Sequence, residues 1–240
     1  MRLLLISNSA MVGEPYLEFP KYEIKKFLGE KPVTAVVIPY SAVIQTYDEF
    51  CEKVEQRFAE LGHHCVGLHT FSNPLKAIEE AEAIVMGNGN TWTLARKLHD
   101  KKLMNPIRER VFNGIPYIGW SAGLNIAGPS LRTTNDMPII DPRGFDCIGL
   151  VPFQINPHFT EENIRDHAGE TREQRIEEFI KINTSVYVVG LREGTMLKLE
   201  NEKLRLIGNK PCKIFKNGLK SFELTSRDDL TFLLKTGVLA

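Results

Sequence analysis

The first half of the chain alternates short apolar runs with segments of helical spacing, and this alternation restricts the fold more than any other feature. The apolar runs lack polar alternation, which predicts strands buried on both faces, at residues 2–7, 33–38, 65–68, 83–86 and 117–120. Between them, Phe50, Val54 and Phe58 recur on one face of a helix predicted at 47–61. This order is typical of a parallel sheet with helices on both faces. The sequence therefore predicts an α/β fold, a three-layer sandwich with a mostly parallel central sheet.

The second half is less regular. Residues 131–145 are rich in Pro, Asp, Asn and Gly, which predicts a long loop that carries functional rather than core residues. An apolar stretch broken by Pro152 leads to Pro157 and His158. Further elements are predicted as a helix at 171–182, a strand at 186–190, a hairpin around 200–203 and a last strand at 213–215. Because no repeat, low-complexity segment or linker interrupts the chain, we expect residues 1–240 to form a single domain.

Composition limits the partners. The chain carries 30 Lys and Arg against 30 Asp and Glu, for a formal net charge of zero, and no basic run stands out. Nucleic acid and membrane surfaces are therefore not expected as partners, and no apolar segment is long enough to cross a bilayer. The first apolar run is too short for a signal peptide, and the four cysteines are scattered without a C-x-x-C pair. We therefore expect a soluble cytoplasmic protein.

One apolar run ends in Gly119-Trp120-Ser121-Ala122-Gly123, and a helix can start directly after it. Gly-x-Ser-x-Gly between a strand and a helix is the context in which a serine hydroxyl is held exposed on a sharp turn. Glycine is expected at both flanking positions because a Cβ there would collide with backbone. The N–H of Ala122, at the helix N-terminus, is placed to stabilise an oxyanion. A tightly packed turn without chemistry is the alternative.

A catalytic serine needs a base, and the base needs a third group that orients it. Of the six histidines, His158 follows an apolar stretch and Pro157, at a strand end where the ligand sites of α/β sheets lie. A structural role is the alternative for His158. The remaining histidines are interpreted as structural or surface residues: His63, His64, His69, His99 and His167.

Two carboxylates are candidates for the third group. Asp136 lies in the polar segment 133–138, and Glu193 follows the strand predicted at 186–190. Either side chain could instead stabilise a turn through a hydrogen bond to the backbone, or be a charged residue on the surface. Residues 87–90, Gly-Asn-Gly-Asn, lie between a strand and a helix, where they offer a second oxyanion N–H or a phosphate site. A nucleotide site is disfavoured because the turn is not G-x-G-x-x-G and no Lys follows it.

Residues 170–175, Glu-Thr-Arg-Glu-Gln-Arg, are typical of a helix N-terminus with Thr171 as the cap. An arginine in the first turn opposes the helix dipole, which favours anions at that end. Such an arginine is explained by a carboxylate ligand, which a guanidinium binds in bidentate fashion, or by an ion pair with Glu170 or Glu173. Both explanations are open at this point.

Four segments together resemble the peptidase E family of α-aspartyl dipeptidases. They are 119–123 (GWSAG), 132–138 (RTTNDMP), 154–159 (QINPHF) and 169–175 (GETREQR), and they occur in this order. The resemblance implies a fold similar to class I glutamine amidotransferases. It also implies a serine peptidase that hydrolyses dipeptides with an N-terminal aspartate, Asp-X, without a metal or another cofactor. The resemblance is weakest beyond Cys212.

By motif position, the resemblance implies roles for single residues. Ser121 would be the nucleophile and His158 the base. The family's third member has been placed at the positions of both Asp136 and Glu193, so both are kept. Arg172 matches the arginine with which the family recognises the substrate aspartate.

One departure concerns the turn at 87–90. The family's turn reads Gly-Gly-Gly-Asn, whereas Asn88 stands here at the second position and Gly89 is kept. We expect the N–H groups of Ala122 and Gly89 to hold the oxyanion, and the side chain of Asn88 to narrow the substrate pocket or alter the oxyanion hole. The alternatives are an esterase, an amidotransferase-like hydrolase or a non-catalytic binding protein on the same scaffold. A small peptide substrate and a monomer or homodimer are expected.

Overall fold

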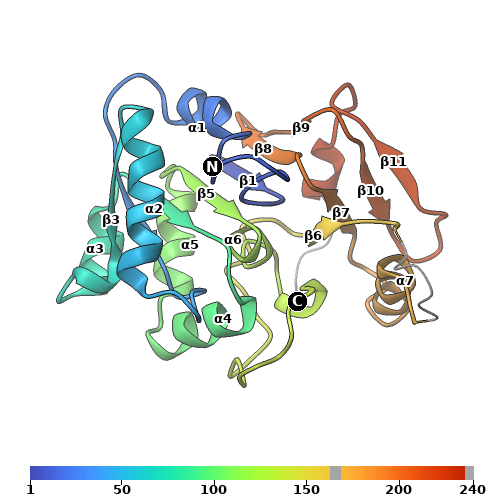
Figure 1. Cartoon of the computed structure of the whole chain (residues 1–240). Helices are drawn as coiled ribbons and strands as arrows, with labels where there is room; N and C mark the ends of the chain where they lie inside the picture. Colours follow the sequence, from blue (N-terminus) through green and yellow to red (C-terminus); the bar gives the residue numbers. More distant parts are fainter. Residues whose placement is uncertain (163–168, 236–240) are drawn as a thin grey trace.

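A seven-stranded sheet forms the centre of the molecule (Figure 1). Its strands follow the order β3 (His64–Gly67), β2 (Thr34–Ile38), β4 (Ala83–Met86), β5 (Tyr117–Trp120), β1 (Leu3–Ile6), β8 (Met196–Glu200) and β9 (Lys203–Ile207). The computed structural model describes residues 1–162 and 169–235. β1 to β5 pair in parallel, whereas β8 and β9 form an antiparallel hairpin beside β1. The predicted mostly parallel sheet is confirmed.

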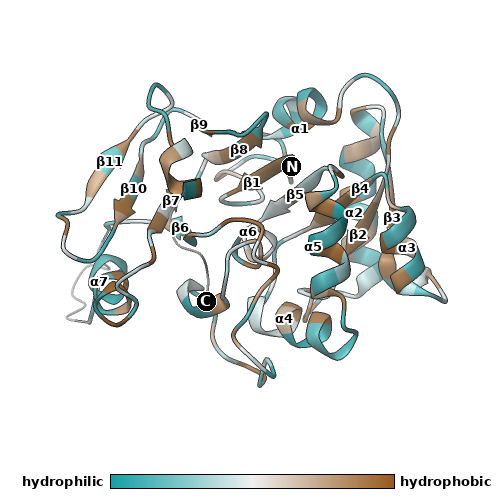
Figure 2. Ribbon diagram, turned by 180° about the vertical axis from the view of Figure 1, so that it is seen from behind, coloured by the Kyte–Doolittle hydropathy of each residue, from teal (hydrophilic) through white to brown (hydrophobic). Residues whose placement is uncertain are grey.

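Helices cover both faces of this sheet because alternate strand residues point to opposite faces. On one face, Leu4 and Val85 share a core with Phe50 and Phe58. On the other face, Leu5 packs in the core that the second group of helices shares. The helices are α1 (Lys21–Leu28) and α2 (Tyr47–Glu60) on the first face, and α3 (Pro74–Glu80), α4 (Thr91–Asp100) and α5 (Met104–Phe112) on the second. Figure 2 shows the apolar strands between helices that carry polar stretches.

A second sheet of four strands lies beside the first and was not expected from the sequence. Its order is β11 (Phe222–Leu224), β10 (Cys212–Phe215), β7 (Val188–Arg192) and β6 (Gln154–Phe159). One face packs through Ile155 and Val189 into the same core as Leu5. The other face is covered by α7 (Arg172–Ile182), whose Ile176 and Ile180 contact Val188 in a smaller core. β6 and β7 therefore lie between the main core and α7.

Short elements complete the described chain. They are α6 (Ala122–Asn125) and three 3-10 turns, η1 (Leu68–Thr70), η2 (Leu131–Thr133) and η3 (Thr231–Lys235). No helix among residues 1–162 and 169–235 has the length and apolar character needed to span a membrane.

Two element boundaries have local causes. Helix α1 begins at Lys21, with Pro20 as its N-cap, because a proline disfavours helical geometry in the residue before it. The stretch before Pro157 pairs as a strand only from Gln154, since the N–H of Ile148 donates instead to a carbonyl at the end of α6. The long loop predicted at 131–145 is present and contains only η2.

Candidate active site

The candidate nucleophile lies on a strained turn between β5 and α6. Ser121 has φ 53° and ψ −108°, a conformation that L-residues rarely adopt, and it is the N-cap of α6. A Cβ on Gly119 would lie 2.5 Å from the carbonyl oxygen of Gly123, and a Cβ on Gly123 would lie 2.1 Å from that of Met86. Both flanking glycines are therefore required by backbone contact, which confirms the steric reason inferred from the sequence.

Ser121, His158 and Glu193 form a continuous chain of contacts. Ser121 Oγ lies 2.8 Å from His158 Nε2, and His158 Nδ1 lies 2.7 Å from Glu193 Oε1. Ser121 follows β5 of the large sheet, whereas His158 and Glu193 belong to β6 and to the end of β7 in the small sheet. A hydroxyl, an imidazole and a carboxylate in this order can transfer the hydroxyl proton to the imidazole and stabilise the resulting cation.

The second candidate carboxylate lies elsewhere. Asp136 Oδ2 accepts hydrogen bonds of 2.6 Å from both the N–H and the hydroxyl of Thr91, the first residue of α4. The Trp92 indole N–H donates to the carbonyl of Asp136 at 3.0 Å. Asp136 thus fastens the long loop to the N-terminus of α4, where the helix dipole favours an anion. Of the two carboxylates left open by the sequence, the structure brings Glu193 to the imidazole.

A buried serine holds the backbone of His158. His158 has φ 54° and lies where the pairing of β6 with β7 shifts its register, so it sits within an irregular strand rather than on a loop beyond it. Its N–H donates to Ser7 Oγ at 3.1 Å, and Ser7 Oγ donates to the carbonyl of Leu191 at 2.9 Å. Ser7 is fully buried at the carboxyl end of β1. Sequence reasoning missed Ser7, although a polar residue directly after a buried strand was a visible signal.

Asn8, the residue after Ser7, holds the turn that carries Glu193. Asn8 Oδ1 accepts a hydrogen bond of 2.9 Å from the N–H of Gly194, and Asn8 Nδ2 donates to the carbonyl of Ala10 at 2.8 Å. The turn that carries Glu193 is therefore attached to the end of β1. Asn8 was also missed from the sequence.

The turn at 87–90 follows β4, next to β5, and its glycines are sterically required. Gly89 has φ 138°, and a Cβ there would lie 2.2 Å from the carbonyl oxygen of Ser41. Ala122 occupies the first position of α6, where a backbone N–H has no partner within the helix. Gly89 and Ala122 thus belong to adjacent turns at the carboxyl edge of the sheet, Gly89 after β4 and Ala122, next to Ser121, after β5.

The side chain of Asn88 is held by two aromatic residues. Asn88 Oδ1 accepts hydrogen bonds from the Tyr16 hydroxyl at 2.8 Å and from the Trp120 indole N–H at 3.0 Å. Burial raises the pKa of Tyr16, which keeps its hydroxyl protonated as a donor. The amide oxygen of Asn88 is thus occupied inside the protein, and the two hydrogen bonds attach the turn to Tyr16 and Trp120.

Arg172 starts α7, with the Thr171 side chain as its cap. Its guanidinium donates to the carbonyl of His158, and at 3.5 Å to that of Pro157. Partial burial lowers the pKa of Arg172, but a guanidinium stays charged at any physiological pH. Arg172 lines two hollows of about 630 and 300 Å³, the first beside His158 and Glu193 and the second beside Asp136.

The acidic residues near Arg172 that the sequence offered as partners have other contacts. Glu170 lies 3.8 Å from Arg175, and Glu173 lies 2.9 Å from Lys213. The ion pair suggested for the helix start is thus made by Arg175 with Glu170, whereas Arg172 experiences the negative charge of Glu193.

One other nucleophile–base contact occurs among the described residues: Cys51 Sγ lies 4.0 Å from His69 Nδ1, but burial raises the pKa of this thiol to about 12, so it is not activated. His64 contacts Glu55, His69 contacts Asp48 and His99 contacts a backbone carbonyl, while His63 is buried. His167 lies outside the described residues. No group of three or more His, Cys, Asp or Glu in residues 1–162 and 169–235 is arranged to hold a metal.

The four cysteines are free thiols. Burial raises the pKa of Cys51 and Cys212 to about 12 and also raises the pKa of Cys65 and Cys147. The thiolate is the reactive form, so none of these thiols is activated as a nucleophile.

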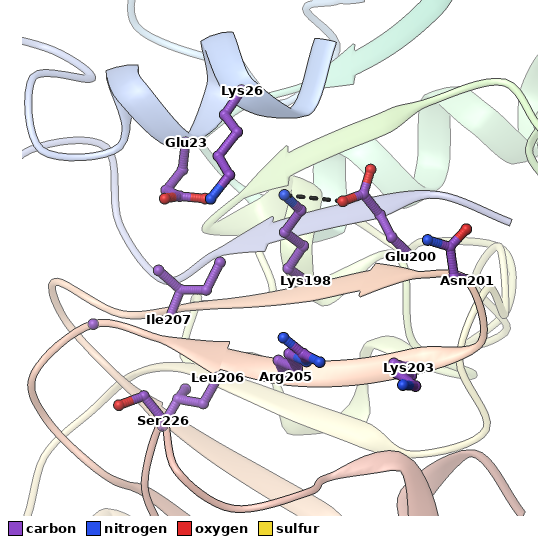
Figure 3. Close-up of a pocket in the computed structure, with 11 residues that line it drawn as sticks. Glu23, Lys26, Lys198, Glu200, Asn201, Lys203, Arg205, Leu206, Ile207 and Ser226 are labelled. Carbon is purple, nitrogen blue, oxygen red and sulfur yellow. Dashed lines mark ion pairs between the residues drawn. The ribbon is translucent and has the colours of Figure 1, made fainter. Parts of the chain in front are cut away.

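A larger groove lies away from this site, between α1 and the β8–β9 hairpin (Figure 3). Its walls carry Lys26, Lys203 and Arg205, together with Lys198, which pairs with Glu200 at 2.9 Å. The groove contains no nucleophile next to a base, so the candidate active site remains at Ser121.

Comparison with known proteins gives consistent matches. The model of the family described as Peptidase family S51 matches residues 3–207. A protein named Peptidase E from Nostoc sp. is 50% identical over 234 residues, which cover 98% of this chain and 97% of the relative. A Peptidase E from Salmonella paratyphi A is 44% identical over 224 residues, which cover 93% of this chain and 97% of the relative.

Solved structures agree in fold. A crystal structure of a candidate peptidase E from Listeria monocytogenes EGD-e superimposes with a TM-score of 0.64 at 19% identity, over 87% of this chain and 98% of that one. A peptidase from an acI-B1 actinobacterium gives a TM-score of 0.65 at 18% identity, over 95% and 96% of the two chains. The predicted α/β fold is therefore confirmed.

Proposed function

The chain belongs to peptidase family S51, and from this premise we propose that it is a serine dipeptidase that hydrolyses Asp-X dipeptides. As a member of a peptidase family, the protein is a hydrolase that acts on peptides. The serine mechanism and the preference for aspartate are our proposal. The observation that carries it is the contact chain from Ser121 through His158 to Glu193, with the guanidinium of Arg172 bonded to the carbonyl of that same histidine.

In the proposed mechanism, Ser121 Oγ attacks the peptide carbonyl while His158 Nε2 takes its proton. Glu193 accepts a hydrogen bond from His158 Nδ1, which fixes the tautomer and stabilises the imidazolium. The N–H groups of Ala122 and Gly89 bind the oxyanion, and one such donor typically lowers the barrier by about 3 kcal/mol. His158 then protonates the leaving amine, and water activated by the same imidazole hydrolyses the acyl-enzyme.

Arg172 is proposed to recognise the substrate aspartate. A guanidinium has five N–H donors, so it can serve the carbonyl of His158 and still bind a carboxylate in bidentate fashion. Its partial burial strengthens that attraction, because the interaction is less screened than on an open surface. The aspartate would thus be bound next to the catalytic base. The protein would act in the cytoplasm, as a monomer or homodimer, without metal or another cofactor.

The proposal is tested with a panel of X-Leu dipeptides, scored for release of free leucine by the full chain. We expect cleavage of Asp-Leu and little cleavage of Ala-Leu or Lys-Leu. Ser121→Ala should abolish turnover while leaving the circular dichroism spectrum unchanged. Arg172→Ala should lower kcat/KM for Asp-Leu by about 10- to 100-fold, the range for a lost charged hydrogen bond, with a much smaller effect on any residual Ala-Leu cleavage.

The same assay separates the alternatives. An esterase would hydrolyse nitrophenyl esters well and ignore the dipeptides, and a binding protein would show no labelling by a serine-directed phosphonate. Retained turnover in Ser121→Ala would remove Ser121 from its role. Equal losses for Asp-Leu and Ala-Leu in Arg172→Ala would contradict recognition of the aspartate by this arginine.

A further inference from the structure

We propose that a cleft beside Gly89 binds the side chain of the second substrate residue, X, and selects apolar residues there. This inference rests on the proposed Asp-X hydrolysis and adds the preference at X. The cleft measures about 590 Å³, within the range of small-molecule sites. We call it the apolar cleft, and its apolar walls are Ala42, Val43, Ile44, Met137 and Ile139.

The walls expose apolar side chains that the protein itself does not cover. Ile44 is 99% exposed, Met137 75% and Ile139 55%. They come from two loops far apart in the sequence, yet they line the same cleft. Apolar side chains gathered in one exposed hollow, which Gly89 of the proposed oxyanion hole also lines, are typical of a ligand site.

Asn90 attaches both walls of the apolar cleft to the turn at 87–90, which carries Gly89. The Asn90 N–H donates to the carbonyl of Ser41 at 2.9 Å, and Asn90 Nδ2 donates to the carbonyl of Met137 at 3.0 Å. Asn90 directly follows Gly89 and is also the N-cap of α4. The apolar cleft is thus fixed relative to the N–H group proposed to bind the oxyanion.

Strand order gives the direction of the bound peptide. Ser121 follows β5, Gly89 follows the neighbouring strand β4, and residues 41–45 follow β2, the next strand along. His158 and Arg172 lie toward the other side, where the small sheet meets β1. A dipeptide whose aspartate reaches Arg172, and whose carbonyl lies between Ser121 and Gly89, therefore extends its second residue toward the apolar cleft.

Charge in the cleft opposes acidic residues at X. Asp136 is the one ionised side chain among its described lining residues, and its carboxylate is held by Thr91. An acidic X would approach this carboxylate, and the arginines near Asp136, among them Arg172, line the neighbouring hollow rather than the apolar cleft. Leucine, methionine or phenylalanine at X would instead cover the exposed apolar walls.

The test measures kcat/KM for Asp-Leu, Asp-Phe, Asp-Gly, Asp-Glu and Asp-Lys with the full chain. We expect Asp-Leu and Asp-Phe to exceed Asp-Gly by about tenfold or more, the order expected for apolar groups in a hydrophobic pocket, and Asp-Glu to be poorest. Ile139→Asp should remove most of the advantage of Asp-Leu over Asp-Gly and raise Asp-Lys relative to Asp-Leu. The matched control is Leu219→Asp, because Leu219 is also 55% exposed but lies outside the cleft.

The outcomes separate this inference from the proposed function. If all five dipeptides are cleaved at similar rates, or if Ile139→Asp changes their order no more than Leu219→Asp does, the assignment of the cleft is wrong while Asp-X hydrolysis stands. If no Asp-X dipeptide is cleaved, both proposals fall. A shift of preference confined to Ile139→Asp supports the cleft as the site of X.

Discussion

Glu193 and Asp136 are both acidic residues near the strand ends, yet they contact different parts of the molecule. Glu193 lies against the imidazole of His158, whereas Asp136 ties a loop to Thr91 at the start of α4. In the proposed mechanism Glu193 stabilises the imidazolium of His158, whereas Asp136 holds a loop in place. The two roles predict different consequences when each charge is removed without a change in size.

We therefore expect Glu193→Gln to lower kcat for Asp-Leu by several orders of magnitude, about 10⁴ in the best-studied serine triad, because the imidazolium loses its anion. Asp136→Asn should keep kcat within about tenfold, and should lower the free energy of unfolding by about 1 kcal/mol because the N-terminus of α4 loses an anion. Steady-state kinetics and thermal unfolding of both variants measure the difference. A larger loss of kcat in Asp136→Asn than in Glu193→Gln would assign the third member to Asp136.

Among the elements, the end of β1 connects the two sheets at the active site. Ser7 bonds to the backbone of β6 and β7, and Asn8 bonds to the turn after Glu193. The strained backbone of His158 is thereby held from outside its own sheet. Ser7 is a positioning residue, because it acts on His158 through the main chain.

For Ser7→Ala we expect kcat for Asp-Leu to fall about tenfold with KM nearly unchanged, since the loss of a buried hydrogen bond costs about 1–3 kcal/mol and releases the base rather than the substrate site. Ser7→Thr, which keeps the hydroxyl, should restore much of kcat. The control is Ser130→Ala, because Ser130 is also buried and accepts a bond from Gln154 in β6. Equal kinetic effects in Ser7→Ala and Ser130→Ala would mean that Ser7 is only structural.

At the scale of the whole molecule, one core reaches both sheets. Leu5 and Leu197 of the large sheet pack in the same cluster as Ile155 and Val189 of the small sheet. We therefore expect residues 1–240 to unfold as one unit. Heat denaturation followed by far-ultraviolet circular dichroism, tryptophan fluorescence and residual activity should give coincident midpoints. Separate midpoints would contradict the single domain predicted from the sequence.

Local signals were sufficient for much of the fold. The strand at 83–86 lies where the sequence predicts it, and the helix predicted at 47–61 is observed at Tyr47–Glu60, because periodicity depends on neighbouring residues. The small sheet was not predicted, since β6 pairs with β7 across the intervening α7 and no local pattern encodes that pairing. For the same reason the sequence could not decide whether Asp136 or Glu193 contacts the imidazole of His158. Ser7 and Asn8 were missed because their hydrogen-bond partners lie more than 100 residues away in the chain.

The high pKa values of the cysteines have a practical consequence. Maleimide dyes react with thiolates, so the natural cysteines should label slowly at neutral pH. A cysteine introduced at Ile44, which is open to solvent, would label first. A fluorophore attached there would stand at the mouth of the apolar cleft and could report, without any turnover, when a peptide enters or leaves.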